Sequence, residues 1–175
     1  CSSLASVVIP DSVTSIGNYA FAYCSNLASV VIGNSVTSIR KYAFYNCGNL
    51  ATVTIPNSVT SLKQHCFYWC KKLENINFMG DTQIDYDAFE EVGTDTTISG
   101  VTLYFATDIT ETVASDAFED ADIKEIVIAD STTEGLDIGG ITLVKDTNVT
   151  SFFYGVPDSN NDPSGQIPVS YSDDP

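Results

Sequence analysis

Residues 24–46 read CSNLASVVIGNSVTSIRKYAFYN, and residues 47–69, which follow at once, read CGNLATVTIPNSVTSLKQHCFYW. The two stretches agree at more than half of their positions, and a similar unit precedes them at residues 1–23. A weaker copy, CKKLENINFMGDTQIDYDAFEEV, follows at residues 70–92. Each unit begins with a cysteine, so cysteines recur at a constant step of 23, at Cys1, Cys24, Cys47 and Cys70. The chain is therefore an array of internal repeats.

Each unit contains one short stretch with the pattern of a half-buried strand. The segment Leu-x-x-Val-x-Ile places alternate residues inward and outward, which is the period of a strand. Pro10, Gly33 and Pro56 follow this segment and end it. A Ser-Val-Thr-Ser-Ile stretch then crosses the next side, and Tyr-Ala-Phe-x-x-Cys makes a short helical or irregular return. Because one unit cannot bury its apolar side alone, the units must stack, with parallel strands about 4.8 Å apart.

The full pattern, Leu-x-x-Val-x-Ile-Pro-x-Ser-Val-Thr-x-Ile-x-x-x-Ala-Phe-x-x-Cys, resembles the BspA-like leucine-rich repeat over residues 1–92. Ser35 and Val36 stand where the general leucine-rich repeat has an Asn/Cys-x-Leu step, and this difference is typical of the subclass. The resemblance implies a right-handed leucine-rich-repeat solenoid with one parallel sheet face. It also implies a secreted or surface-attached protein of a host-associated bacterium or a protozoan. Members of this family are regarded chiefly as adhesins.

The repeat weakens after residue 92, and the rest of the chain is expected to close the array. We expect a fifth strand near residues 98–103, a sixth over residues 123–128, and a loop between Gly93 and Gly100. The predicted domains are a solenoid of about six units over residues 1–134, capping strands over 135–155, and a polar tail or linker over 156–175. Cys1 starts in repeat register, which suggests missing upstream repeats and an open edge through which copies could self-associate.

The charge of the chain is divided between its two halves. The net charge is −16, yet residues 1–77 carry five basic residues against two acids, and residues 78–175 carry two basic residues against 21 acids. Such an acidic chain is not expected to bind nucleic acid, whose phosphates it would repel. No apolar run approaches the ~18 residues of a membrane span, so no membrane insertion is expected.

Little in the sequence points to catalysis or to a metal site. Cys66 and Cys70 lie four residues apart, but no second pair completes a zinc site. His65, the one histidine, occupies the repeat position of Tyr19, Tyr42 and Asp87, which indicates a structural role. The oxygen-rich residues 158–165 depart from a calcium loop in the position of the glycine. We therefore expect no catalytic residue, no metal, no cofactor, and no effect of chelators on stability.

The cysteines themselves are expected to be buried free thiols, since a free cysteine behaves as a small hydrophobic residue. Cysteines stacked in neighbouring coils could approach disulfide distance, but their side chains should point into the core in parallel. The thiol interpretation is therefore favoured for all of them.

Two surfaces are candidates for partner binding, and the sequence does not choose between them. The first is the outward side of the strands, with Ser29, Val31, Thr52, Thr54, Asn75 and Asn77. The second is the return side, with Tyr45, Tyr68, Trp69, Arg40, Lys41 and Lys63. The strand positions are small and uncharged, which also fits simple strand propensity. Tyrosines one coil apart also fit a packing ladder, although Tyr, Trp and Arg are typical of interface hot spots.

The predicted function is a non-enzymatic extracellular binding scaffold, bound to a protein of the host or its matrix. The word adhesin comes from the family resemblance, because the residues themselves indicate only a long repeated surface. One alternative is a structural spacer on the cell surface. A less favoured one is a carbohydrate-binding or hydrolytic module, which would need an aromatic platform beside carboxylates.

Overall fold

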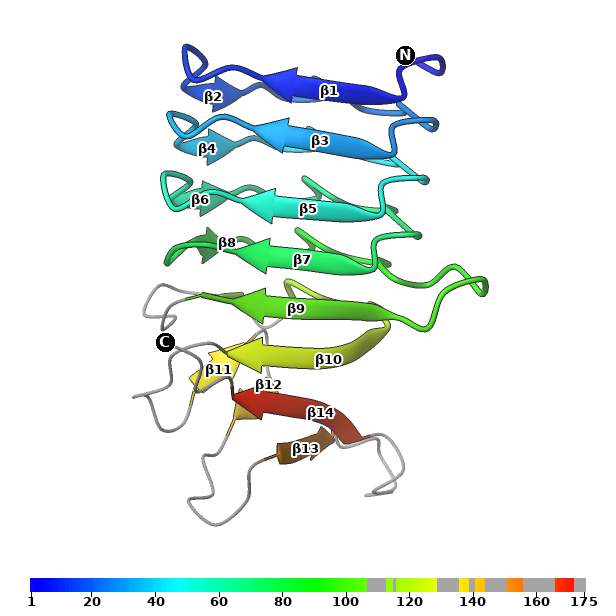
Figure 1. Cartoon of the computed structure of the whole chain (residues 1–175), viewed down its shortest axis with the longest axis vertical. Helices are drawn as coiled ribbons and strands as arrows, with labels where there is room; N and C mark the ends of the chain where they lie inside the picture. The colour runs from blue at the N-terminus through cyan, green and yellow to red at the C-terminus, as the bar shows by residue number, and fades with distance from the viewer. Residues whose placement is uncertain are drawn as a thin grey trace.

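The computed structural model describes residues 1–106, 113–114 and 116–128, and the backbone of four strands between residues 136 and 171. Strands stack one below the other from the N-terminus, so each repeat makes one coil of a solenoid (Figure 1). We number the coils from the N-terminus, with the first over residues 1–23, the second over 24–46, the third over 47–69 and the fourth over 70–92. This arrangement confirms the predicted solenoid with a face of stacked parallel strands.

The main sheet has the strand order β1-β3-β5-β7-β9-β10-β14-β13. Neighbouring strands are parallel up to β14, and β13 pairs with β14 in the antiparallel sense. The strands are β1 (Ser6–Ile9), β3 (Ser29–Ile32), β5 (Thr52–Ile55), β7 (Asn75–Phe78), β9 (Val101–Phe105), β10 (Ile123–Ile128), β13 (Ser151–Gly155) and β14 (Gln166–Tyr171). Ser6 pairs with Ser29 and Thr52 with Asn75, so the register keeps the 23-residue step of the sequence.

A second, narrower parallel sheet covers the next side of the coil, in the order β2-β4-β6-β8. Its strands are β2 (Ser15–Ile16), β4 (Ser38–Ile39), β6 (Ser61–Leu62) and β8 (Gln83–Ile84). The return side consists of turns and not helices over residues 18–23, 41–46, 64–69 and 86–93. Within the part of the chain that the structure describes, no helix is long and apolar enough to cross a membrane.

Columns of identical or similar side chains fill the interior between the sheets and the turns. The clearest is a ladder of phenylalanines, in which each ring stacks on the next at centroid distances of 5.1–5.2 Å. Its members are Phe21, Phe44, Phe67, Phe89 and Phe118. The backbone N–H of Phe44 donates to the carbonyl of Cys66 at 2.8 Å, and that of Phe67 to the carbonyl of Ala88 at 2.9 Å. Hydrogen bonds between turns therefore join the coils on this side as the sheets do on the others.

The cysteine column corrects one expectation. Cys1 and Cys24 form a disulfide, with Cα atoms 4.8 Å apart, whereas the sequence analysis favoured thiols throughout. The coil spacing falls within the range of about 4.4–6.8 Å that a disulfide spans, and the Cys1 and Cys24 side chains point toward each other rather than into the core in parallel. Cys47, Cys66 and Cys70 are free and buried. Burial raises the pKa of the Cys66 and Cys70 thiols, which keeps both protonated at neutral pH.

Beyond the fourth coil, the strands match the predicted pattern with two differences, the start of β9 and the presence of β14. The loop between Gly93 and Gly100 precedes β9, which starts at Val101 rather than at residue 98, and β10 covers the predicted sixth strand. Strands β11 (Leu136–Ile138) and β12 (Ile141–Leu143) form an antiparallel pair. Strand β14 lies inside residues 156–175, for which the sequence indicated a tail. This segment forms a strand because its backbone pairs with the otherwise exposed edge of β10. The predicted boundaries at 134 and 155 stay predictions, and the oxygen-rich residues 158–165 lie outside the described residues.

Candidate functional site

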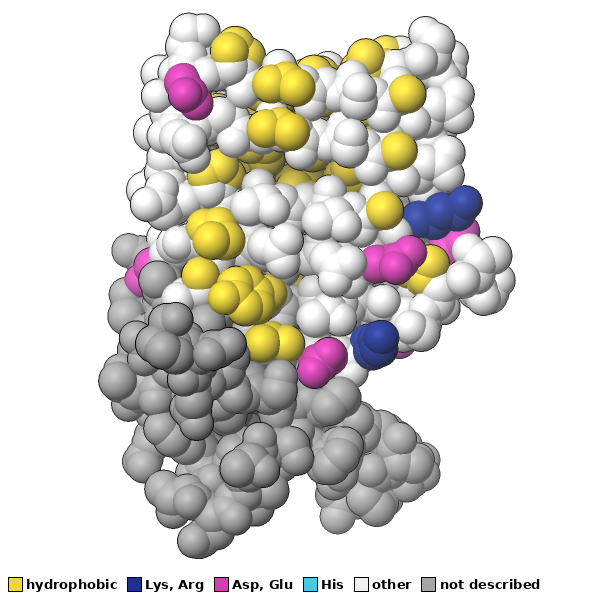
Figure 2. All heavy atoms as spheres, viewed as in Figure 1, with side chains coloured by type: hydrophobic (Ala, Val, Ile, Leu, Met, Phe, Trp, Pro, Cys, Tyr) yellow, Lys and Arg dark blue, Asp and Glu magenta, His cyan; other side chains and the backbone are white. Residues whose placement is uncertain are grey.

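The outward face of the main sheet is uncharged over the first four coils and combines small polar side chains with exposed valines. Figure 2 shows this face, where charged side chains lie only near the margins of strands β1 to β7. The sequence-predicted residues Ser29, Thr52, Thr54 and Asn75 are exposed there and Asn77 is half-buried. Val8 and Val31 are 71% and 58% exposed. A shallow hollow of about 450 Å³ adjoins them, with Val31, Thr54, Pro56 and Met79 in its lining. The structure thus brings the six predicted sheet residues together on one strip.

The turns of the return side share an unusual backbone. Two positions in each turn of the first four coils, and one in the turn that follows, adopt the left-handed conformation, which non-glycine residues rarely occupy. The first column has φ values of 55–58° and the second has φ values of 52–63°. The first contains Tyr19, Tyr42, His65 and Asp87, and the second contains Tyr23, Asn46, Trp69, Glu91 and Asp120. Hydrogen bonds between coils hold this backbone, for example from Tyr19 N–H to the carbonyl of Lys41 at 3.1 Å.

Six aromatic side chains of the first three coils lie against one another on these turns. We call them the aromatic surface: Tyr19, Tyr23, Tyr42, Tyr45, Tyr68 and Trp69. Tyr19 stacks on Tyr42 at 4.8 Å, and Tyr45 stacks on Tyr68 at 5.4 Å. Tyr42 also contacts Tyr45 edge-to-face at 5.7 Å, which joins the Tyr19–Tyr42 stack to the Tyr45–Tyr68 stack. Tyr19 and Tyr23 are each 57% exposed, and the other four rings are half-buried.

Three hydroxyls of this surface, those of Tyr42, Tyr45 and Tyr68, stay neutral. A hydrogen bond with Tyr23, together with desolvation, raises the pKa of Tyr45 to about 12. Desolvation, followed by the charge of neighbouring groups, raises the pKa of both Tyr42 and Tyr68. The surface can therefore donate and accept hydrogen bonds at its polar tips while its rings supply apolar contact.

Basic side chains border the aromatic surface. Arg40, Lys41 and Lys63 line a second shallow hollow of about 450 Å³. Lys63 lies 3.7 Å from an Asp85 oxygen, and Lys41 Nζ donates to Gln64 Oε1 at 3.2 Å. Both contacts are at the surface, where a single ion pair contributes little and leaves the charge accessible.

A further basic residue sits on the other side of the rings. The Lys71 ammonium lies 5.3 Å from the ring centroid of Trp69, within the distance of a cation–π contact. It also pairs with Glu91 at 2.9 Å, and this hydrogen bond lowers the pKa of the Glu91 carboxyl. The predicted return-side residues are thus adjacent in space, in one aromatic group with bases on both sides.

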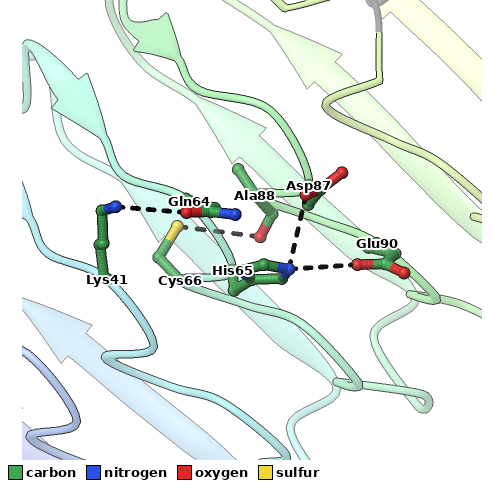
Figure 3. A network of polar contacts seen from close by, with 7 residues as sticks. All are labelled: Lys41, Gln64, His65, Cys66, Asp87, Ala88 and Glu90. Carbon is green, nitrogen blue, oxygen red and sulfur yellow. Dashed lines mark hydrogen bonds and ion pairs between the residues drawn. The ribbon is translucent and has the colours of Figure 1, made fainter.

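The structure also forms a polar cluster that the sequence analysis did not identify. Asp87 and Glu90, from the turn of the fourth coil, both approach the same nitrogen of His65 in the third coil (Figure 3). His65 Nε2 lies 3.5 Å from Asp87 Oδ2 and 3.4 Å from Glu90 Oε2. The side chains of His65, Asp87 and Glu90 are only 14%, 18% and 20% exposed. Three groups capable of binding a metal therefore converge on one half-buried point.

Burial controls the protonation of this cluster. Desolvation lowers the pKa of His65, although the nearby Asp87 carboxylate opposes it. Desolvation and the charges of neighbouring acids raise the pKa of Glu90. The imidazole is therefore neutral at physiological pH and provides no charge to balance the two carboxylates.

The repeats and their stacking agree with a known family. The profile of the BspA type leucine rich repeat region matches residues 1–104 in 6 copies. The chain belongs to this family. No curated protein matches the chain.

Two solved structures resemble this BspA-type solenoid. The leucine rich repeat protein of T. pallidum has a TM-score of 0.60 at 24% sequence identity, over 75% of this chain and 65% of that one. A leucine rich cell surface protein from Faecalibacterium prausnitzii A2-165 has a TM-score of 0.46 at 26% identity, over 83% of this chain and 44% of that one. The chain thus spans less than two thirds of either protein. The T. pallidum structure supports the fold, and neither supplies a function for this chain.

Within this BspA-type array, the aromatic residues of the return side are predictable from the sequence, but the carboxylate partners of His65 are not. The one available signal was the repeat position that His65 shares with Asp87, which places the two side chains in neighbouring coils. Glu90 shares its position with Tyr45 and Tyr68 and was not connected with His65. Nothing in a one-dimensional pattern shows that residues three apart in such a turn point to the same nitrogen.

Proposed function

We propose that the chain is a non-enzymatic extracellular binding scaffold, which attaches to a protein of a host or its matrix through the aromatic surface. The observation that carries this proposal is the contact of six rings across three coils, with Tyr19 and Tyr23 largely exposed. Isolated surface tyrosines would be unremarkable, but a contiguous rigid group is typical of an interface.

The rigidity of this surface favours affinity. Side chains that are already stacked lose little conformational entropy when a partner covers them. The left-handed backbone at Tyr19, Tyr23 and Trp69 is held by hydrogen bonds between coils, so the rings keep their positions without a partner. Arg40, Lys41 and Lys63 beside the rings favour a partner with acidic groups at the matching place.

An extracellular position is supported by two observations. Membership of the BspA-type family is one. The other is the disulfide between Cys1 and Cys24, since disulfides persist in oxidising compartments outside the cytosol.

The sheet face is the second candidate surface for partner binding, because Val8 and Val31 are exposed on it beside a shallow hollow.

A binding screen with matched variants tests the proposal. The purified chain is measured against a panel of matrix proteins, host surface proteins and glycans. For any partner found, the variant Tyr19→Ala/Tyr23→Ala should weaken affinity roughly tenfold or more, as for hot-spot residues. The matched sheet-face variant Thr52→Ala/Thr54→Ala should change it by less than about threefold. Circular dichroism and thermal melting confirm that both variants fold.

Other results of this screen would redirect the proposal. Loss of binding in the sheet-face variant alone would move the site to the outward side of β5 and its neighbours. A glycan as the only ligand would favour the carbohydrate-binding alternative. Absence of any partner would favour a spacer that holds another part of a surface protein away from the cell.

A further inference from the structure

We propose that His65, Asp87 and Glu90 form a binding site for a divalent transition metal ion such as Zn²⁺, coordinated by one imidazole and two carboxylates. This inference does not depend on the proposed partner binding, because it concerns three side chains and an ion alone. It replaces the expectation from the sequence that the chain has no metal site.

The distances between the three ligand atoms fit a metal centre. Zinc binds histidine nitrogen and carboxylate oxygen at about 2.0–2.2 Å, usually in a tetrahedron, whose ligand atoms are then about 3.3–3.6 Å apart. His65 Nε2 lies 3.5 Å from the Asp87 oxygen and 3.4 Å from the Glu90 oxygen. One ligand atom from each residue lies within 4.8 Å of the others. The two distances from His65 therefore already match a zinc centre, and an ion would draw the two carboxylate oxygens into the same range.

The charges at this point also favour a cation. The carboxylates of Asp87 and Glu90 lie together beside one nitrogen of His65, and Glu91, Glu119 and Asp120 add further negative charge to the surroundings of Glu90. Lys41 is the basic residue that acts on His65 there. A divalent ion would balance the charge of both carboxylates. Imidazole with carboxylates is a donor set that suits zinc and its neighbours in the first transition row.

The His65 ring and the backbone of Asp87 are held in place before any ion arrives. The His65 ring stacks on Tyr42 at 4.8 Å and contacts Tyr68 at 5.1 Å. Asp87 sits at a left-handed position with φ of 55°, and its N–H donates to the carbonyl of Asp116 at 3.2 Å. Because His65 belongs to the third coil and the carboxylates to the fourth, a bound ion would cross-link two coils. Three protein ligands leave a fourth position for water or for another ligand.

The experiment is a titration of the full, metal-free chain with Zn²⁺. Isothermal titration calorimetry measures the binding, and thermal melting measures the change in Tm. We expect one ion per chain in the site, and a rise in Tm of roughly 5–10 °C at a free zinc concentration of ~100 Kd. Co²⁺ serves as a second probe, because its visible spectrum separates nitrogen and oxygen ligands from thiolates.

Three near-isosteric variants locate the site. Asp87→Asn and Glu90→Gln remove a charge without disturbing the stacked ring of His65, and each should weaken zinc binding at least tenfold. Asp85→Asn is the matched control, because Asp85 lies in the same coil and pairs with Lys63 instead; its affinity should equal that of the unchanged chain. Far-ultraviolet circular dichroism confirms the fold of each variant.

Three outcomes would overturn the proposal, the first because no ion binds and the other two because it binds elsewhere. The first is the absence of any saturable zinc binding or Tm shift in the folded chain. The second is binding that Asp87→Asn and Glu90→Gln leave unchanged, and the third is a Co²⁺ spectrum dominated by thiolate ligands.

Discussion

The rings of Tyr42 and His65 stack across one coil boundary, with centroids 4.8 Å apart and planes within 11° of each other. The same column continues upward to Tyr19 and downward to Asp87, so His65 lies between aromatic and acidic side chains. This border coincides with the division of charge in the sequence, where basic residues predominate before residue 78 and acids after it. One turn position therefore serves ring packing in the early coils and carboxylate clustering in the later ones.

The phenylalanine ladder predicts a large loss of stability on truncation in its middle. Phe44 is fully buried between Phe21 at 5.2 Å and Phe67 at 5.1 Å. Phe44→Ala should lower the free energy of unfolding by about 3–5 kcal/mol, measured by urea denaturation, because it removes buried area and leaves a cavity. Phe21→Ala is the control, and its half-buried ring should give a clearly smaller loss. Equal, small losses at both positions would show that the ladder is not the core of the array.

A glycine at the start of β9 offers a test of backbone conformation. Gly100 has φ of +93°, and an added Cβ would lie 2.7 Å from the carbonyl oxygen of Asp122. Gly100→Ala should therefore destabilise the chain by about 1–3 kcal/mol in a denaturant titration. Gly17→Ala is matched to it, since a Cβ there meets no atom within 4 Å. That variant should have stability equal to or slightly above the original, and a comparable loss in both would contradict the argument.

Much of this fold follows from the repeat, and the candidate metal site does not. The positions of Val30, Ile32 and Phe44 in their unit predict burial directly, because a constant step places equivalent residues in one column. The turn conformation could not be predicted, since tyrosine and tryptophan ordinarily avoid the left-handed region that they occupy here. The step also shortens in the fourth coil, where Ser61 pairs with Gln83.

The disulfide lay beyond sequence reasoning for a related reason. The repeat places four cysteines in one column, yet the column alone does not distinguish the pair that bonds from those that stay thiols. Cys1 and Cys24 are joined, whereas Cys47 donates its thiol to the carbonyl of Phe21 at 3.2 Å and Cys70 to that of Phe44 at 3.2 Å. The choice depends on side-chain direction in each coil.

The protonation of His65 predicts how stability depends on pH in the absence of metal. Burial lowers its pKa below the unfolded value of 6.5, so the unfolded chain binds this proton more readily than the folded one. The stabilising contribution is therefore present above pH 6.5 and is lost as the pH falls through the folded pKa. Glu90 has a raised pKa, so its contribution to stability has the opposite pH dependence: it is present at low pH and is lost as the pH rises through the folded pKa of Glu90.

Chemical denaturation from pH 7.5 down to about 5.5, with a chelator present, measures this contribution. The free energy of unfolding should decline more for the original chain than for His65→Gln, which carries no titratable ring. Tyr42, Tyr68, Lys41 and the two carboxylates surround the ring in both proteins, so their effects largely cancel in the comparison. Parallel pH profiles for the two proteins would contradict a lowered pKa for His65.

The basic border of the aromatic surface predicts how salt affects partner binding. Arg40 and Lys41 are exposed and line the hollow beside the rings, so they should speed the encounter with an acidic partner. Arg40→Gln/Lys41→Gln should lower the association rate several-fold at low ionic strength and leave the dissociation rate nearly unchanged. Raising the salt to 1 M, where the screening length falls to about 3 Å, should remove most of the difference between variant and original.

Lys124→Gln is the control, because Lys124 is exposed on β10 in the acidic half and lies away from the rings. Its association rate should match that of the original chain at every salt concentration. Stopped-flow or surface plasmon resonance measurements supply the rates. A partner whose association rate ignores both salt and the Arg40/Lys41 change binds through the rings alone, and the electrostatic part of the proposed interface would then be wrong.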